Sequence, residues 1–458
     1  MQRILQILFG IFLFSFPFGY RWLVYEETAY RFGHFNPFVS GFVYLPEILL
    51  VAIFVLWVGF GVCNKSFNSC FRSLRVSRDE KTRRGADKSR SYRGGTGDVA
   101  VQRLYVVSVL FVFNALLVTF WRGDFVLAMF FLVRMLEMGM LYCLLTSRLL
   151  SFSQMARWLL WGVCAQVGIA FLQYYFNHSI GLGLLGESKI GADILNVAKT
   201  NLVSGIKQIR GYGTFLHPNI LAGYLLLVTS VIFVHLKGWW RWLLLLILLL
   251  GLYVSGSHAA WIVFGLLIGI SFLFSLWKEQ RLRRRATVLI VTIVMLVSGL
   301  LLFDSHRLSS DKLSFEQRFE QNSISRNMII AHPFGVGVRN FTLEMELANC
   351  GADGGTDGGT NCGTNCGMTK LKPWEFQPVH NVFLLTLNET GIQGLLLLLA
   401  LIFTWVYRCR KQGKALGFFA LLLFAPFDHF LWDSWAGMML IVLVFAFLAE
   451  KRDTELSI

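Results

Sequence analysis

The chain has 458 residues, of which 55% are hydrophobic and 15% are charged, and its formal net charge is +15. A soluble protein of this length would carry roughly a quarter charged residues, so this composition excludes an ordinary soluble enzyme. Apolar runs of membrane-spanning length recur along the whole sequence and predict a polytopic membrane protein.

The spans of such a protein are expected to be helical, because lipid offers no partners to backbone polar groups. The predicted fold class is therefore an all-α polytopic integral membrane protein with about twelve transmembrane helices. The predicted spans, in chain order, are 4–19, 40–63, 104–121, 125–146, 157–177, 214–234, 242–255, 259–277, 286–303, 380–407, 415–430 and 435–449.

Lysine and arginine gather in alternate loops, which orients the chain by the positive-inside rule. Every short loop assigned to the cytoplasm is basic when both termini, with the tail of segment 380–458, are placed there. Between the first two helices (1–63) and the third lies the most basic loop, 64–103, which is rich in Gly and Ser and is expected to be disordered. The net charge therefore indicates membrane topology rather than a nucleic-acid partner.

Two long loops are expected on the outer face. The first, 178–213, lies within the helical segment 104–303, and the second is the large loop 304–379. Apolar residues at a helical period predict an amphipathic surface helix over 312–334, which ends at Pro333 and Gly335.

The large loop also contains a low-complexity insertion, 349–368, with a repeated Thr-Asn-Cys-Gly unit. Its cysteines, Cys350, Cys362 and Cys366, allow three readings: a metal site, one disulfide in an oxidising exterior, or free thiols. No histidine stands at ligand spacing, and we predict neither a metal nor a cofactor.

Polar groups from distant parts of the chain meet on the predicted outer face. Arg210 is the first of them, because its guanidinium fork suits the paired oxygens of a phosphate. His217-Pro218 follows and opens a helix whose free amide groups attract anions. The other members are His258, Arg318, Arg326, Arg339, His380, Asp428 and His429.

His380 follows a proline and precedes a descending helix. A neutral imidazole near pH 7 is a natural general base for a sugar hydroxyl. The adjacent Asn381 is placed to orient the acceptor or the imidazole ring. The sequence thus predicts a base and an anion-binding arginine at one membrane surface.

Three ordered segments carry a family resemblance: RGYGTFLHPNILAGYL, HPFGVGVRNF and VHNVFLLTLNETGIQGLLLLL. Within a frame of about twelve spans they resemble the O-antigen ligase family, whose superfamily includes O-antigen polymerases and bacterial O-oligosaccharyltransferases. The resemblance covers roughly residues 180–435, and the first four spans are similar only in pattern.

The resemblance implies a transferase that passes a glycan from undecaprenyl diphosphate to an acceptor hydroxyl, without nucleotide sugar or metal. It implies that Arg210 contacts the diphosphate and that His380 is catalytic. The family's Ser-Arg-Gly element reads Ser255-Gly-Ser-His258 here, so another arginine is expected to take that place. The expected substrate-binding residues are His217, Asn219, His258, Arg318, Arg326, Arg339, Asn381, Asp428 and His429.

The leading functional prediction is thus an O-antigen ligase-like glycan transferase of the bacterial cytoplasmic membrane, with its active site facing outward. A polysaccharide polymerase is the first alternative, since it differs only in the acceptor, which is a lipid, polysaccharide or protein. A transporter or flippase of lipid-linked sugars is the second. A transporter is expected to show internal repeats and charged, broken helices in both halves, and the sequence shows no convincing repeat.

Overall fold

The computed structural model describes residues 1–27, 30–31, 34–63, 95–195, 197–201, 207–277, 305–350, 375–409 and 416–449. The amino-terminal part contains α1 (Gln2–Ser15), β1 (Arg21–Tyr25), β2 (Tyr30–Arg31), β3 (His34–Phe35), η1 (Pro37–Val39), β4 (Gly41–Tyr44) and α2 (Leu45–Cys63). The central part contains α4 (Gly95–Arg122), α5 (Phe125–Thr146), α6 (Phe152–Phe176), η2 (Gly183–Leu185), β5 (Lys199–Asn201), β6 (Lys207–Ile209), α7 (Pro218–Ile232), α8 (Trp239–Ser255) and α9 (His258–Trp277). The last part contains α11 (Ser305–Ala331), α12 (Phe341–Cys350), α13 (Val382–Cys409), α14 (Leu416–Phe424), α15 (Phe430–Asp433) and α16 (Trp435–Ala449).

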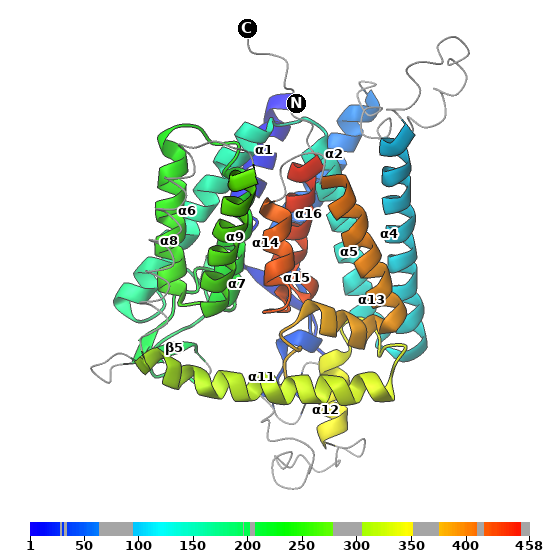
Figure 1. Ribbon diagram of the computed structural model, residues 1–458, viewed down its shortest axis with the longest axis vertical. Coiled ribbons are helices and arrows are strands. Elements are labelled where there is room, and N and C mark those ends of the chain that lie inside the picture. The colour runs from blue at the N-terminus through cyan, green and yellow to red at the C-terminus, as the bar shows by residue number, and fades with distance from the viewer. Residues whose placement is uncertain are drawn as a thin grey trace.

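The described chain is mostly helical, and its long helices stand side by side as a bundle (Figure 1). Within the described part of the chain, three helices are long and apolar enough to cross a membrane: Phe125–Thr146, Phe152–Phe176 and Val382–Trp405. Shorter apolar helices in α1, α2, α4, α7, α8, α9 and α16 coincide with other predicted spans. The total of about twelve spans and the side on which the termini lie stay predictions.

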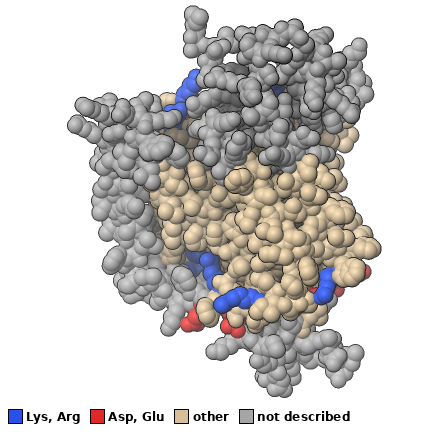
Figure 2. All heavy atoms as spheres, turned by 45° about the vertical axis from the view of Figure 1, so that its right-hand side comes forward, with Lys and Arg blue, Asp and Glu red and all other residues tan. Residues whose placement is uncertain are grey.

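The middle of the bundle is apolar both on its described surface and in its core. Figure 2 shows a belt of the described surface without charged side chains, and Lys, Arg, Asp and Glu gather along its lower border. Inside, aromatic and aliphatic side chains such as Phe9, Phe12, Tyr224 and Phe424 are fully buried in one continuous core. The apolar belt is what a lipid-facing surface requires.

The described residues also form three small antiparallel sheets of two strands each, which the predicted all-helical fold did not include. The sheets pair β1 with β4, β2 with β3, and β5 with β6. They lie in the connections between helices, where the chain reverses direction and backbone groups need partners. The predicted span 286–303 lies outside the described residues, as do residues 64–94 of the predicted basic loop 64–103 and residues 351–368 of the predicted insertion 349–368. Residues 95–103 of that loop, which was expected to be disordered, form the start of α4, and residues 349–350 end α12.

The predicted surface helix is present as α11, which ends at Ala331 just before His332-Pro333. It lies across one end of the bundle, nearly perpendicular to the upright helices, and contacts both α13 and β5 (Figure 1). We call this the α11 end of the bundle. α1 begins and α16 ends at the opposite end.

Two predicted spans are interrupted near the α11 end. The span predicted over 415–430 ends as α14 at Phe424, because Pro426 disfavours helix at the preceding residue. The span predicted over 380–407 is present as α13, but it is broken at Gly391, whose φ is 73° and ψ is −179°. The first interruption leaves Asp428 and His429 in non-helical chain between α14 and α15.

The break in α13 is fastened to the loop that follows α11. Val336 and Gly337 donate backbone hydrogen bonds to Asn388 and Glu389, each at 2.9 Å. A side chain at position 391 would collide with the backbone of Phe334. Only glycine combines this positive φ with so close an approach.

Replacing Gly391 by Ala should therefore lower the free energy of unfolding by on the order of 1–3 kcal/mol, from strain in the backbone and the collision. Gly139→Ala is the matched control, because Gly139 lies within α5 with no atom near the position of its missing Cβ. Thermal unfolding of the two purified variants in detergent measures the difference. An equal or higher midpoint for Gly391→Ala than for Gly139→Ala contradicts this account of the break.

Candidate functional site

Three separate connections at the α11 end supply Arg210 and His217, His380, and Asp428 and His429. Arg210 directly follows β6, and His217 immediately precedes α7. His380 lies in the loop before α13, while Asp428 and His429 lie between α14 and α15. The loops of His380 and Asp428 are joined by a 2.9 Å backbone hydrogen bond from the Val382 N–H to the Ala425 carbonyl.

Two buried glutamines of α6 hold the segment that follows Arg210. The Gln173 Oε1 accepts hydrogen bonds from the backbone N–H groups of Tyr212 and Gly213, at 3.0 and 2.9 Å. The Gln166 Oε1 accepts from the Thr214 N–H at 2.9 Å, and its Nε2 donates to the Thr214 hydroxyl at 2.8 Å. Sequence reasoning missed both residues, although two polar amides inside an apolar helix were a visible signal.

The Arg210 guanidinium is oriented by two helix ends. Its Nε donates to the Ser255 carbonyl, at the last residue of α8, over 2.7 Å. One terminal nitrogen donates to Asn219 Oδ1 in the first turn of α7, over 2.8 Å. The sequence grouped Arg210 with Asn219, and the structure gives the physical reason: Asn219 positions the arginine.

His217 serves as the N-cap of α7. Its Nδ1 accepts the Asn219 N–H at 3.2 Å, so any proton of the neutral ring is on Nε2. Burial, followed by the charge of Arg210, lowers the pKa of His217 to about 3. The ring is therefore neutral at physiological pH and presents an N–H donor. The charges of Asp428, His380 and Arg318 also act on it, which places His217 amid the candidate residues.

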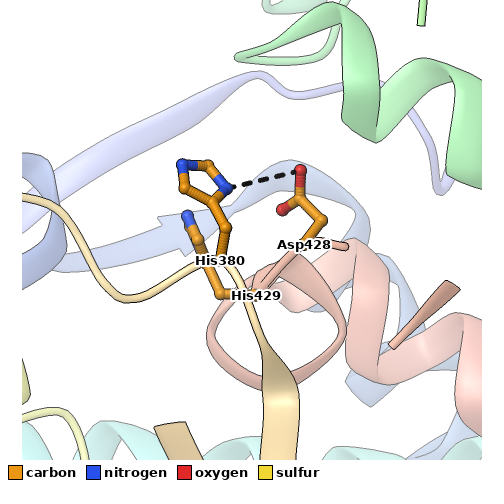
Figure 3. Close-up of side chains that lie close together, drawn as sticks. All are labelled: His380, Asp428 and His429. Atoms are coloured by element: carbon orange, nitrogen blue, oxygen red, sulfur yellow. Dashed lines mark ion pairs between the residues drawn. The ribbon is translucent and has the colours of Figure 1, made fainter. Parts of the chain in front are cut away.

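His380 and Asp428 face each other across the two tied loops (Figure 3). The distance from His380 Nδ1 to Asp428 Oδ2 is 3.8 Å, too long for a hydrogen bond but short for an electrostatic contact of buried groups. Burial lowers the pKa of His380, and Asp428 offsets part of that shift. Burial raises the pKa of Asp428, but His380 and His429 lower it well below its usual range on balance. Near neutrality the pair is thus a carboxylate and an uncharged imidazole.

His429 belongs to a second imidazole–carboxylate pair. Its Nδ1 is 2.8 Å from Asp433 Oδ2, and its ring centroid is 4.9 Å from that of His380. Burial lowers the pKa of His429, but the charge and hydrogen bond of Asp433 raise it above the ordinary value. Sequence reasoning missed Asp433, which lies one helical turn after His429, at the i, i+4 spacing that brings side chains together.

The three candidate arginines of the large loop separate in space. The charge of Arg318, on α11, opposes protonation of all three site histidines, His217, His380 and His429. Arg326 is exposed on the same helix. Arg339 adopts a left-handed backbone with φ 62° and donates to the Ser40 carbonyl at 3.0 Å, where Asp433 and Glu389 are its acidic neighbours. Of the three, Arg318 is therefore the one whose charge reaches the histidines.

Two further candidates lie at helix starts. The Asn381 Oδ1 accepts the N–H groups of Phe383 and Leu384, at 2.9 and 3.1 Å, and so caps α13. His258 opens α9, two residues after Gly256, whose backbone lies against the Arg210 side chain. Asn381 therefore has a local structural role as a helix cap. His258 lies two residues after the glycine that packs against Arg210.

Among the described residues, one group offers ligand atoms to a metal ion. The candidate atoms of His380, Asp428 and His429 lie within 4.8 Å of one another. Two imidazoles and a carboxylate are suitable ligands for zinc or other transition metals. The sequence prediction of a metal-free site therefore needs a direct measurement.

The comparisons with known proteins agree with the resemblance found in the sequence. A family model described as O-Antigen ligase matches residues 243–361, a segment that includes α9, α11 and α12. The matched segment is 119 of the 458 residues, and over it the match confirms the resemblance to the O-antigen ligase family, whose members are membrane enzymes of the ligase and polymerase type. No curated protein matches the chain.

We expect the protein, purified without chelators, to contain far less than one equivalent of zinc, manganese or other divalent metal. The reason is that the Asp433 carboxylate occupies His429 Nδ1, and Asp428 Oδ1 already accepts the Phe430 N–H at 3.2 Å. Inductively coupled plasma mass spectrometry measures the content. A near-stoichiometric metal that disappears in both His380→Ala and Asp428→Ala would show that these residues form a metal centre.

Proposed function

We propose that the protein transfers a glycan from undecaprenyl diphosphate to an acceptor hydroxyl at the outer face of the bacterial cytoplasmic membrane. The observation that carries the proposal is the convergence of Arg210, Arg318, His380 and Asp428 on His217 at the α11 end. Two cations suit a diphosphate, and an uncharged imidazole beside a carboxylate suits proton abstraction.

The two arginines have the task of binding the donor diphosphate. Arg210 is oriented before substrate arrives, since Ser255 and Asn219 hold two of its nitrogens. Arg318 adds a second positive charge from α11 and takes the place of the arginine that the Ser255–His258 element lacks. The His217 Nε2–H adds a neutral donor. Fixed donors and charges stabilise a leaving group best when they need no reorganisation.

The general base is His380. Its Nδ1 faces Asp428, so the tautomer with the proton on Nδ1 leaves the Nε2 lone pair for the acceptor hydroxyl. As the acceptor oxygen bonds to the anomeric carbon, its proton passes to Nε2 and the bond from that carbon to the phosphate oxygen breaks. The leaving diphosphate keeps the electron pair beside Arg210 and Arg318. Attack opposite the leaving group inverts the anomeric centre.

Asp428 acts through His380. Its negative charge stabilises the imidazolium that forms during transfer, and the 3.8 Å contact shortens to a hydrogen bond when substrate is bound. His429, whose pKa is raised by Asp433, has its ring centroid 4.9 Å from that of His380 and adds positive charge there when it is protonated. The proposed site thus combines one uncharged base with several charged groups at fixed positions.

A polymerase uses the same donor chemistry with a second lipid-linked glycan as acceptor, whereas a flippase forms no new bond. Proteoliposomes with labelled lipid-linked glycan separate these functions. Covalent transfer to a hydroxyl acceptor other than the carrier-linked glycan supports the ligase. Chain growth on the carrier supports the polymerase, and movement between leaflets without a product would contradict enzymatic transfer.

Arg210→Ala and Arg318→Ala should each lower kcat/KM for transfer by about 10²–10³-fold, because each removes a fixed charge at the leaving group. Lys207→Ala and Arg326→Ala are matched controls, since both residues are exposed and lie on β6 and α11 respectively. Initial rates are measured in proteoliposomes after equal insertion is verified. Parental rates for Arg210→Ala or Arg318→Ala exclude the diphosphate role of that residue.

Asp428→Asn should lower kcat by about 10²–10⁴-fold and also move the acidic limb of the pH–rate profile. The His380 base is active above its own pKa, and Asp428 raises that pKa, so loss of the charge lowers it further. The acidic limb must therefore shift to lower pH in the variant. A profile that keeps its parental position, or His380→Ala rates that stay parental over about pH 6 to 8, would remove His380 as the base.

A further inference from the structure

A buried polar seam lies where α11 crosses the first part of α13. It consists of Gln321 and Ser325 of α11 and Asn388 of α13, which are 0%, 0% and 1% exposed. The Asn388 amide nitrogen donates to the Ser325 hydroxyl at 2.6 Å, so this face of α11 meets α13. Gln321 lies one turn before Ser325 on the same face.

The seam contains polar atoms without partners. Both side-chain polar atoms of Gln321 and the Oδ1 of Asn388 have no hydrogen-bond partner among the described residues. Buried polar groups are nearly always paired, because an unpaired one loses its hydrogen bonds to water and gains none in the protein. Unpaired amide donors and acceptors at one crossing therefore indicate a partner that the described residues do not supply.

The position of the seam suggests what that partner is. Arg318 precedes Gln321 by three residues and Ser325 by seven, so all three share one face of α11. Arg318 is the cation whose charge reaches the three site histidines. A group that leaves the diphosphate along this face of α11 meets Gln321 next, and then Ser325 and Asn388.

We infer that the seam binds hydroxyl groups of the first sugar of the lipid-linked donor. The inference rests on the proposed function and adds the sugar-recognising element to it. A sugar presents neighbouring hydroxyls, each of which donates and accepts, and an amide with both functions unpaired complements such a pair. Because the seam is closed in this structure, the sugar enters when α11 rises from α13, and its hydroxyls then satisfy the unpaired groups.

Three properties of α11 agree with such a movement. The helix lies on the end of the bundle rather than within it (Figure 1). Its outward side chains Phe319 and Ile330 are 68% and 80% exposed, so that face is not packed on the described residues. The unpaired groups of the seam also make the closed position less favourable than an apolar contact would be.

The experiment compares binding of sugar-free undecaprenyl diphosphate with binding of the same lipid carrying one N-acetylglucosamine or one galactose. The parental protein should bind at least one glycosylated lipid more tightly than the sugar-free lipid. Gln321→Leu should remove that preference, with about a tenfold loss for the glycosylated lipid and no change for the sugar-free one. Affinities are measured by native mass spectrometry in detergent, and Asn327→Ala, an exposed change on the same helix, is the control.

Protein stability gives an independent readout. Leucine replaces two unpaired buried polar groups by apolar ones, so Gln321→Leu should keep or raise the thermal midpoint. A lower midpoint with intact sugar preference shows that the role of Gln321 is structural and overturns the inference. If Gln321→Leu does not insert, Gln321→Met tests the same loss of the amide.

The remaining outcomes separate this inference from the proposed function. Equal parental affinities for all three lipids, or equal losses for all of them in Gln321→Leu, overturn sugar recognition by the seam. If Arg210→Ala and Arg318→Ala bind sugar-free undecaprenyl diphosphate as tightly as the parent, the proposed function itself fails. If those two variants lose binding while Gln321→Leu keeps the sugar preference, only the seam is wrong.

Discussion

The negative charge of Asp428 is the constraint on which the site depends. A carboxylate that is 3% exposed needs compensation, and here His380 and His429 supply it. The same carboxylate lies opposite His380 and acts on His217, so it links the proposed general base to the helix cap beside Arg210. Loss of this anion would leave His217 and His380 without the negative charge of Asp428, which offsets the effect of the nearby cations on them.

Helix length and helix breaks determine how deeply the cluster around Asp428 is buried in the bundle. An α-helix of 15 residues such as α7 spans about 22 Å, less than the roughly 30 Å of a hydrocarbon core. Pro426 stops α14 before Asp428 and His429, and Gly391 divides α13 where the loop after α11 is fastened to it. Asp428 and His429 are only 3% and 5% exposed, although they lie in a connection between helices. Burial of this kind would exclude water from the proposed transfer reaction, which hydrolysis would waste.

The sequence was sufficient for the parts of the site that its local motifs mark. Arg210, His217 and His380 stand beside prolines or glycines where apolar runs begin, and the structure brings their charges into mutual reach. The resemblance to the O-antigen ligase family pointed to the same residues, and the family model supports that resemblance over residues 243–361, a segment that does not include them. The surface helix over 312–334 was predictable because its apolar period and its terminal proline both lie within one short segment.

What the sequence could not supply were partners from distant elements. Gln173 fastens the chain after Arg210 from 39 residues away, and no local pattern indicates that contact. The apolar run over 380–407 concealed the break at Gly391, since hydropathy is insensitive to a single positive φ. The choice of Arg318 over Arg326 likewise depends on which face of α11 turns to the bundle.

The most direct measurement is an electron cryomicroscopy structure of the protein in a lipid nanodisc with bound undecaprenyl diphosphate. The account predicts phosphate density between the guanidinium groups of Arg210 and Arg318, in contact with His217 and on the Nε2 side of His380. Diphosphate density bound elsewhere, with Arg210 and Arg318 left in contact only with protein groups, would contradict it.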